Sequence, residues 1–329
     1  MTVYIDTRFL KHTLDLEKNA ILKKADLVDE QSDVHLTQKN NYLKIEKNCA
    51  EIKNTIDNLP CIIVDSEKIY SNNLSDLDKI DTKDIKWYSY IKMLIKKESN
   101  DVIFRDQKIF DDYNAVYFLD KSDKAVLNLK KSGVLCTDSS FSGLSLFEKY
   151  TIHEDPFQFN NLNNFKDRFP ATNAMIIYDQ YIFGRPYVEK LENLIAFIKS
   201  HKCERLEIPF HLTIFYSRYK KDEIFGERHF NLIKNELKKI KNLCFELVEL
   251  NSRISRDRYM ITNYCYMKSG HPFCDTPTPS DFTQILDLYN DNLRSKKIKD
   301  YYNLLEKTPK NLIFKSNPDF QNRIFDGIA

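Results

Sequence analysis

Four short apolar runs in the first half of the chain are each followed directly by an aspartate. The runs cover residues 3–5, 61–64, 115–119 and 134–137, and the aspartates are Asp6, Asp65, Asp120 and Asp138. Continuous apolar runs of this length predict strands buried on both faces, as in a parallel sheet covered by helices. In such a sheet, ligands bind at the carboxyl ends of the strands, so side chains just past those ends can converge.

The segments between these runs predict helices and one further strand. Residues 8–59 are polar with helix-supporting apolar positions, and apolar residues repeat at three-to-four spacing over residues 87–95. Residues 124–132 predict a short helix that Gly133 stops. Residues 102–104 are a short strand candidate. The first half therefore alternates strands and helices.

The second half repeats this alternation after a connector at residues 151–170, which contain prolines and a run of asparagines. Strands are predicted at residues 174–178, 210–216, 245–250 and 258–267, and helices at 188–198, 230–240 and 281–305. The last twenty or so residues have no clear period. We therefore expect an α/β fold with two domains, residues 1–150 and 171–329, each with a mainly parallel central sheet flanked by helices.

Composition narrows the choice of partners. The 329 residues include 50 basic and 48 acidic side chains, a formal charge of +2. This balance gives no global attraction to nucleic acid or anionic lipid, so either partner would have to bind a local patch. No apolar stretch approaches the roughly 20 residues that span a bilayer, and the first residues lack the pattern of a secretion signal. We expect a cytoplasmic protein without a membrane span.

Cysteine and glycine usage excludes several classes of site. The seven cysteines are scattered and form no C-x-x-C pair, so neither a disulfide framework nor a zinc site is indicated. The six glycines include no G-x-G-x-x-G and no phosphate loop ending in G-K-S/T. The sequence therefore lacks the standard glycine-rich loops that bind nucleotide phosphates, which argues against kinases, common ATPases and dinucleotide enzymes. We expect no nucleotide cofactor.

The aspartates after the apolar runs have two interpretations. Several carboxylates gathered at strand ends would hold a hard divalent cation, because Mg²⁺ takes oxygen ligands. Aspartate is also a preferred helix N-cap, and every strand-to-helix loop has a use for one. The sequence leaves both interpretations open.

Two of these aspartates lie in motifs that resemble those of PIN-domain ribonucleases. Asp6 lies in Tyr-Ile-Asp-Thr, and Asp138 ends the run Val-Leu-Cys-Thr-Asp. The family has an Asp at the end of the first strand, an acidic residue in mid-domain, and a strand ending in Thr and Asp near its close. Asp120 or Asp123 would supply the remaining ligand, since each precedes the helix that leads into the last strand.

The resemblance covers about residues 1–150 and implies metal-assisted phosphodiester hydrolysis with one or two Mg²⁺ or Mn²⁺ ions. The strand at residues 115–119 departs from the family, which usually has a helix there, and Asp65 has no secure counterpart. The candidate catalytic residues are Asp6, Asp120 and Asp138, and the candidate metal ligands are Asp6, Asp65, Asp120, Asp123 and Asp138.

A second resemblance covers about residues 170–275. Residues 256–264 read Arg-Asp-Arg-Tyr-Met-Ile-Thr-Asn-Tyr, and residues 269–273 read Ser-Gly-His-Pro-Phe. Together they resemble the His-Asp-Arg … Asn … Gly-(His/Arg)-Gly-Leu/Phe segment of phospholipase-D-like domains, closest to the group related to the C-terminal domain of MIT proteins and its bacterial relatives. Arg256 stands at the His position and Pro272 at the second Gly position.

The second resemblance implies a fold without catalysis. Phospholipase-D enzymes require an H-x-K motif, because His is the nucleophile and Lys holds the phosphate. None of the seven histidines has a Lys two residues later. Arg258 and His271 are candidate phosphate-binding residues. Alternatively, Asp257 and the neighbouring arginines (Arg253, Arg256 and Arg258) form a structural ion-pair cluster.

Basic clusters at residues 218–221, 238–241 and 296–299 would suit nucleic acid, but such runs are more often solvated faces. The working hypothesis is a metal-dependent nuclease joined to a silent phospholipase-D-like domain that binds substrate or a partner. The resemblance of the second half suggests an antiviral or mobile-element context. The competing hypothesis is a non-enzymatic interaction protein that binds a protein or nucleic acid.

Overall fold

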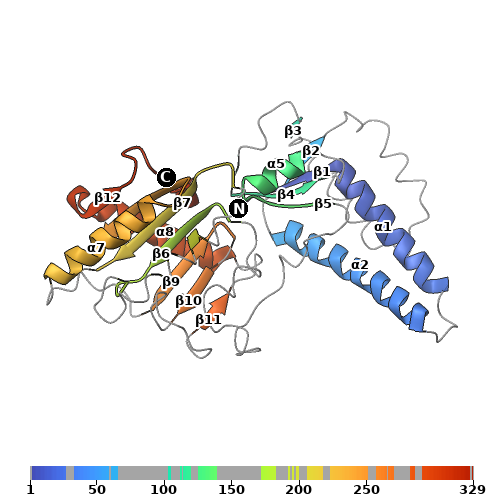
Figure 1. Cartoon of the computed structure of the whole chain (residues 1–329). Coiled ribbons are helices and arrows are strands. Elements are labelled where there is room, and N and C mark those ends of the chain that lie inside the picture. Colours follow the sequence, from blue (N-terminus) through green and yellow to red (C-terminus); the bar gives the residue numbers. More distant parts are fainter. Residues whose placement is uncertain are drawn as a thin grey trace. The chain divides into compact units, whose positions relative to one another are not determined.

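The computed structural model describes residues 2–26, 33–58, 61–65, 103–104, 112, 114–119, 125–138, 172–182, 206–217, 223–250, 257–264, 266–269, 282–285, 291–326 and 328, with 192, 195, 198 and 199. The chain divides into two compact units, which Figure 1 draws in sequence colours. Unit 1 comprises Met1–Lys130 and Leu135–Phe147, and unit 2 comprises Lys131–Val134 and Glu148–Ala329. The predicted connector and the predicted helix at residues 87–95 lie outside the described residues.

Unit 1 contains a five-stranded parallel sheet. Its strands are β1 (Val3–Asp6), β2 (Cys61–Asp65), β3 (Ile103–Phe104), β4 (Val116–Leu119) and β5 (Leu135–Asp138). The strand order is β3-β2-β1-β4-β5, and every neighbouring pair is parallel. Ile5 of β1 and Phe118 of β4 are partners in this sheet, and both are fully buried. This is the sheet that the apolar runs predict.

Three helices of unit 1 lie within the described residues. α1 (Thr7–Asp26) begins directly after β1, and α2 (Asp33–Asn58) runs beside it (Figure 1). The Phe9 ring of α1 stacks on Phe118 with 5.2 Å between ring centroids. α5 (Ala125–Lys131) ends shortly before Gly133, whose φ is 63°. Because glycine has no Cβ, it adopts this left-handed conformation at little cost, and the predicted glycine stop is confirmed.

Unit 2 contains a seven-stranded mixed sheet. Its strands are β6 (Ala174–Tyr178), β7 (Phe210–Tyr216), β8 (Leu243–Glu249), β9 (Arg258–Thr262), β10 (Tyr266–Ser269), β11 (Phe282–Ile285) and β12 (Ile313–Lys315), in the order β11-β10-β9-β6-β7-β8-β12. Only the pairs β6/β7 and β7/β8 are parallel; the other four pairs are antiparallel. The prediction of a mainly parallel second sheet is therefore wrong. Short connections such as the one from β9 to β10 permit only antiparallel pairing.

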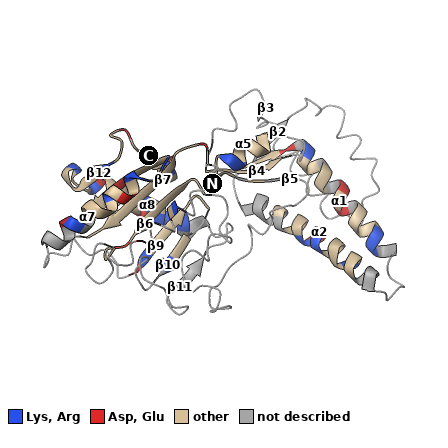
Figure 2. Ribbon diagram, viewed as in Figure 1, with Lys and Arg blue, Asp and Glu red and all other residues tan. Residues whose placement is uncertain are grey.

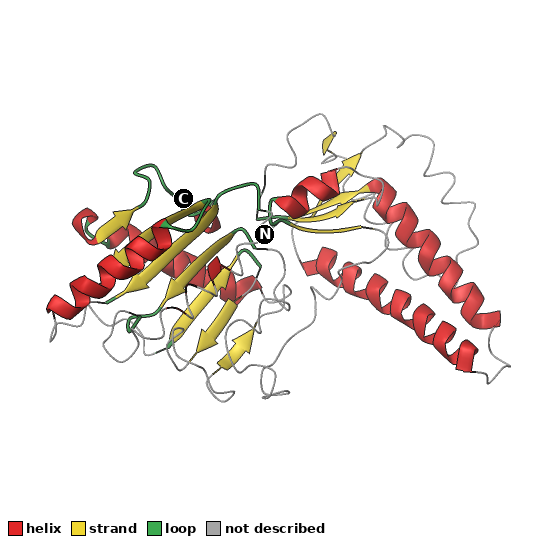
Figure 3. Ribbon diagram, in the orientation of Figure 1, coloured by secondary structure: helices red, strands yellow, loops and turns green. Residues whose placement is uncertain are grey.

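Helices cover both faces of this second sheet, as Figure 3 shows. α7 (Glu223–Lys238) packs on one face through Ile233 and Leu237. α8 (Asp291–Lys307) and the 3-10 turn η10 (Arg323–Phe325) pack on the other face, where Tyr301 stacks on Tyr178 with 5.6 Å between ring centroids. Among the described residues, no helix is both long and apolar enough to cross a membrane.

Two predicted elements of unit 2 differ from the structure. The predicted strand at residues 258–267 is a hairpin of β9 and β10, with residues 263–265 between them. The predicted helix at residues 281–305 contains a strand near its start, because Phe282–Ile285 pairs with β10 as β11. Its described helical part is Asp291–Lys307. The unassigned C-terminal residues contain β12, which pairs with β8.

Candidate functional site

Three aspartates end strands of the unit 1 sheet at one edge. Asp6 is the last residue of β1, Asp65 of β2 and Asp138 of β5, and β4 lies between β1 and β5. Because all these strands are parallel, their carboxyl ends lie along the same edge. The strand order also reverses between β1 and β4, since β2 and β3 lie on one side of β1 and β4 and β5 on the other. Such a reversal is where open α/β sheets bind ligands.

The strand register places Asp6 and Asp138 in one row across the sheet. Ile5 pairs with Phe118, so Asp6 is level with the next residue, Leu119, and Leu119 pairs with Asp138. With one strand between them, the Cα atoms of Asp6 and Asp138 are roughly 9–10 Å apart by ordinary strand spacing. Asp65 lies one position further along β2, since Asp6 pairs with Val64.

The Asp6 carboxylate also caps a helix. Its side chain is 2% exposed, and its Oδ1 accepts a hydrogen bond of 2.7 Å from the backbone N–H of Arg8 in the first turn of α1. This is the N-cap interaction that satisfies one of the free amides at a helix start. The capping interpretation therefore holds for Asp6, whose carboxylate is fixed at the edge of the sheet.

The structure describes only part of the remaining predicted ligands. Asp120, Asp123 and the side chains of Asp65 and Asp138 lie outside the described part of the chain. Within that part, no group of three or more His, Cys, Asp or Glu side chains is placed to hold a metal ion. The structure thus brings together the strand ends that carry Asp6, Asp65 and Asp138, with β4 leading into Asp120 between them.

In unit 2, Arg258 lies against a buried carboxylate. Its Nε is 4.0 Å from Oδ1 of Asp179, which is fully buried just past the end of β6. The Arg258 guanidinium also lies 4.6 Å from the centroid of the Tyr181 ring. The structure thus supplies a protein carboxylate for the predicted phosphate-binding arginine. His271, its predicted companion, lies outside the described residues.

The predicted ion-pair cluster around Asp257 has a member that the sequence did not indicate. Asp257 pairs with Lys268 of β10 at 2.7 Å and accepts a hydrogen bond of 3.4 Å from the Tyr259 hydroxyl. The hydrogen bond to Asp257 raises the pKa of Lys268. Arg253 and Arg256 lie outside the described residues. Lys268 contacts Asp257 because β9 and β10 form a hairpin.

The asparagine of the phospholipase-D-like motif has a structural role. The side-chain Oδ1 of Asn263 accepts hydrogen bonds from the backbone N–H groups of Asn173 and Ala174, at 3.1 and 2.9 Å. Asn263 is fully buried, so these bonds satisfy a polar atom that water cannot reach. They fix the end of β9 against the start of β6.

The basic clusters mostly face solvent. Lys238, Lys239 and Lys241 are exposed, whereas Ile240 between them is buried. Lys296 and Lys299 on α8 are also exposed, and Ile298 between them is buried. Figure 2 shows that α7 and α8 carry acidic as well as basic positions. The first of these clusters therefore lies on a solvated turn at the end of α7, and the second on a largely solvated face of α8. Residues 218–221 lie outside the described residues.

Sequence reasoning missed one buried acid. Glu246 lies in the middle of β8 and is fully buried, in a strand where its neighbours Phe245 and Leu247 are also buried. Burial raises the pKa of its carboxyl group. The signal in the sequence is a charged residue inside an apolar run, because fully buried Glu is rare without a partner.

Comparison with known proteins adds no family to this description: no family model matches the chain, and no curated protein matches its sequence significantly. Function must therefore be argued from the residues and their arrangement.

Proposed function

We propose that unit 1 is a metal-dependent nuclease that hydrolyses phosphodiester bonds of RNA or DNA. The observation that carries the proposal is the row of aspartate-bearing carboxyl ends on β2, β1 and β5, beside the reversal of strand order at β1. Two of these aspartates, Asp6 and Asp138, lie in the motifs that resemble those of PIN-domain ribonucleases.

The donor chemistry of this edge fits Mg²⁺ or Mn²⁺. Carboxylate oxygens are hard ligands, and one or two of them with water complete the usual coordination of Mg²⁺. When bound, the cation would lower the pKa of a coordinated water and neutralise charge on the phosphate. Asp6 would bind with the carboxylate that α1 already orients, while Asp138 and Asp120 would contribute from the neighbouring strand ends.

Unit 2 would be the catalytically silent phospholipase-D-like domain of the same protein. The absence of any H-x-K motif in the sequence supports this assignment. The contacts of Arg258 with Asp179 and Tyr181 are internal to the domain, as expected of a fold that carries out no catalysis. The domain would bind nucleic acid or a protein partner.

The alternative is a non-enzymatic interaction protein. The specific observation in its favour is the hydrogen bond from Arg8 N–H to Asp6, which gives that carboxylate a structural use. In this alternative, the other strand-end aspartates would also serve as helix caps.

A nuclease assay on an Asp6→Asn variant tests the proposal. Asn caps helices about as well as Asp, so this variant keeps its fold while losing a charged ligand. The full chain should cleave labelled RNA or DNA with Mn²⁺ and not with a chelator, and Asp6→Asn should reduce the rate by at least about 100-fold. Asp15→Asn, an exposed change on α1, is the matched control and should retain full activity.

Absence of cleavage of either nucleic acid by the full chain would contradict the proposal and favour the interaction protein. Equal rates for the full chain and Asp6→Asn would contradict the assignment of Asp6. Circular dichroism of both variants would show that any loss of activity is not a loss of fold.

A further inference from the structure

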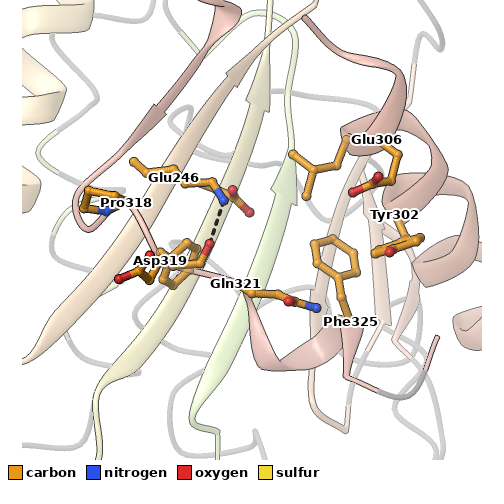
Figure 4. Close-up of a pocket in the computed structure, with 10 residues that line it drawn as sticks. Glu246, Tyr302, Glu306, Pro318, Asp319, Gln321 and Phe325 are labelled. Atoms are coloured by element: carbon orange, nitrogen blue, oxygen red, sulfur yellow. Dashed lines mark hydrogen bonds between the residues drawn. The ribbon is translucent and has the colours of Figure 1, made fainter. Parts of the chain in front are cut away.

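Unit 2 contains a pocket of about 260 Å³ on the face of its sheet that α8 covers. The pocket lies between α8, the strands β8 and β12, and the C-terminal segment that follows β12 (Figure 4). Its lining residues are Glu246, Tyr302, Leu305, Glu306, Lys315, Pro318, Asp319, Phe320, Gln321 and Phe325. Nothing in the proposed nuclease function uses this pocket.

Glu246 presents a buried carboxyl group in this pocket. The Thr213 hydroxyl donates a hydrogen bond of 2.8 Å to Oε1 of Glu246, and Thr213 in turn accepts one of 2.9 Å from Nδ2 of Asn322. These bonds orient the carboxyl group and satisfy one oxygen. Oε2 of Glu246 is buried and has no hydrogen-bond partner among the residues that the structure describes. A buried polar atom without a partner is rare and destabilising, so a ligand that donates there would be stabilised.

The charges of the lining favour a cation. Glu246, Glu306 and Asp319 contribute three carboxyl groups against the single ammonium of Lys315, which leaves −2 when all are ionised. The Lys315 Nζ donates a hydrogen bond of 2.7 Å to the backbone oxygen of Phe320, shown by the dashed line in Figure 4. That bond holds Lys315 in place. An anion such as phosphate would meet net repulsion here.

The shape and the side chains favour an organic cation over a metal ion. The pocket residues all lie within the described part of the chain, where no group of three or more metal-ligating side chains is present. Figure 4 shows Glu246 on one side of the pocket and Tyr302, Glu306 and Phe325 on the other. Aromatic rings attract ammonium groups and pack against alkyl chains.

We propose that this pocket binds a primary alkylammonium group, whose N–H donates to Oε2 of Glu246 and whose alkyl chain lies against Tyr302 and Phe325. The group would come from a small aliphatic diamine or from a lysine side chain of a partner. Burial raises the pKa of Glu246, and a cation at Oε2 would favour the ionised form again. This inference is independent of the nuclease proposal.

Calorimetric titration of the full chain tests the inference with three probes. The probes are 1,4-diaminobutane, Nα-acetyl-lysine methylamide and the uncharged isostere 1,4-butanediol. Both amines should bind, and butanediol should not. Tighter binding of the diamine would identify a free amine as the ligand, and tighter binding of the lysine derivative would identify a side chain; each result supports the site.

Three variants locate the binding. Glu246→Gln should weaken amine binding by roughly 10- to 100-fold, as expected for loss of a charge-assisted hydrogen bond. Glu306→Gln, at an exposed position, should weaken it by roughly 1.5- to 5-fold. Glu227→Gln on the exposed surface of α7 is the matched control and should bind like the full chain.

The inference is overturned if neither amine binds, if butanediol binds as tightly as the diamine, or if Glu246→Gln binds as tightly as the full chain. Should Glu246→Gln fail to fold, Glu306→Gln decides in its place: an affinity for the diamine equal to that of the full chain overturns the inference, and a weaker affinity supports it.

Discussion

Each unit has a buried aspartate at the carboxyl end of a strand, but the surroundings of the two differ. Asp6 ends β1 and accepts a hydrogen bond of 2.7 Å from Arg8 N–H; Asp179 follows β6 and accepts one of 3.0 Å from Tyr181 N–H. Both therefore bond to the amide two residues further on. Asp179 faces the Arg258 guanidinium at 4.0 Å, whereas the strand ends around Asp6 carry further aspartates.

The comparison shows that a strand-end carboxylate acquires its role from the neighbouring strands. In unit 2, the antiparallel strand β9 lies beside β6 and carries Arg258 to Asp179. In unit 1, the neighbours of β1 are parallel, so their carboxyl ends, and the acids on them, share one edge. The first arrangement gives an internal ion pair, and the second is the arrangement on which the proposed cation site rests.

The largest effect on stability should follow from Asp179→Leu. The change leaves the Arg258 charge, which is 12% exposed, without its carboxylate and should lower the free energy of unfolding by about 3 kcal/mol. Urea unfolding of the full chain measures this free energy. Hydrogen exchange of the amides in β6, β7 and β8 reports the part that belongs to unit 2. Adding Arg258→Met should restore part of the loss; no recovery in the double variant would mean that the two side chains are not coupled.

A smaller, pH-dependent effect is expected at His211 of β7. Burial and the nearby Arg323 charge lower the pKa of His211 to about 4, and its Nδ1 accepts a hydrogen bond of 3.2 Å from Arg323 N–H. Unfolded His titrates near its ordinary pKa of 6.5, so the unfolded chain binds more protons and stability falls as pH drops from about 6.5 towards 4.

His211→Gln should remove that part of the pH dependence. The difference in unfolding free energy between the full chain and the variant should shrink as pH falls across this range and stay constant above about pH 7. A difference that does not change with pH would show that His211 carries no linked proton.

The smallest effect should come from the Asp6 cap. Asp6→Ala should lower stability by about 1 kcal/mol, and Asp6→Asn should change it little, because Asn caps as well as Asp. Thermal unfolding of the three proteins measures this order. An Asn variant as unstable as the Ala variant would mean that the charge of Asp6, rather than its cap, stabilises unit 1.

Much of unit 1 could be predicted because its information is local. The continuous apolar runs ending at Asp6, Asp65 and Asp138 mark strands buried on both faces, and this pattern needs no knowledge of distant residues. Gly133 likewise marks the end of α5 through its own backbone preference. The sequence left open whether Asp6 caps a helix, and the hydrogen bond from Arg8 N–H shows that it does.

The elements of unit 2 were harder to predict, because those that differ from the prediction form by pairing between segments far apart in the sequence. Phe282 and Ile285 are spaced like one face of a helix, yet they form the strand β11 because β10 offers an unpaired edge. β12 has only three residues, too few to show a period, and is held by β8. The Glu246 carboxyl group is oriented by Thr213, which is 33 positions away along the chain. Thr213 in turn bonds to Asn322, which is 109 positions away from it.

The most direct test of the account is Mn²⁺ binding to the full chain, measured by electron paramagnetic resonance without any substrate. The account predicts specific binding that Asp138→Asn and Asp6→Asn each weaken by at least about tenfold, while Asp15→Asn leaves it unchanged. Equal Mn²⁺ affinity in all four proteins, or no specific binding to the full chain, would contradict it.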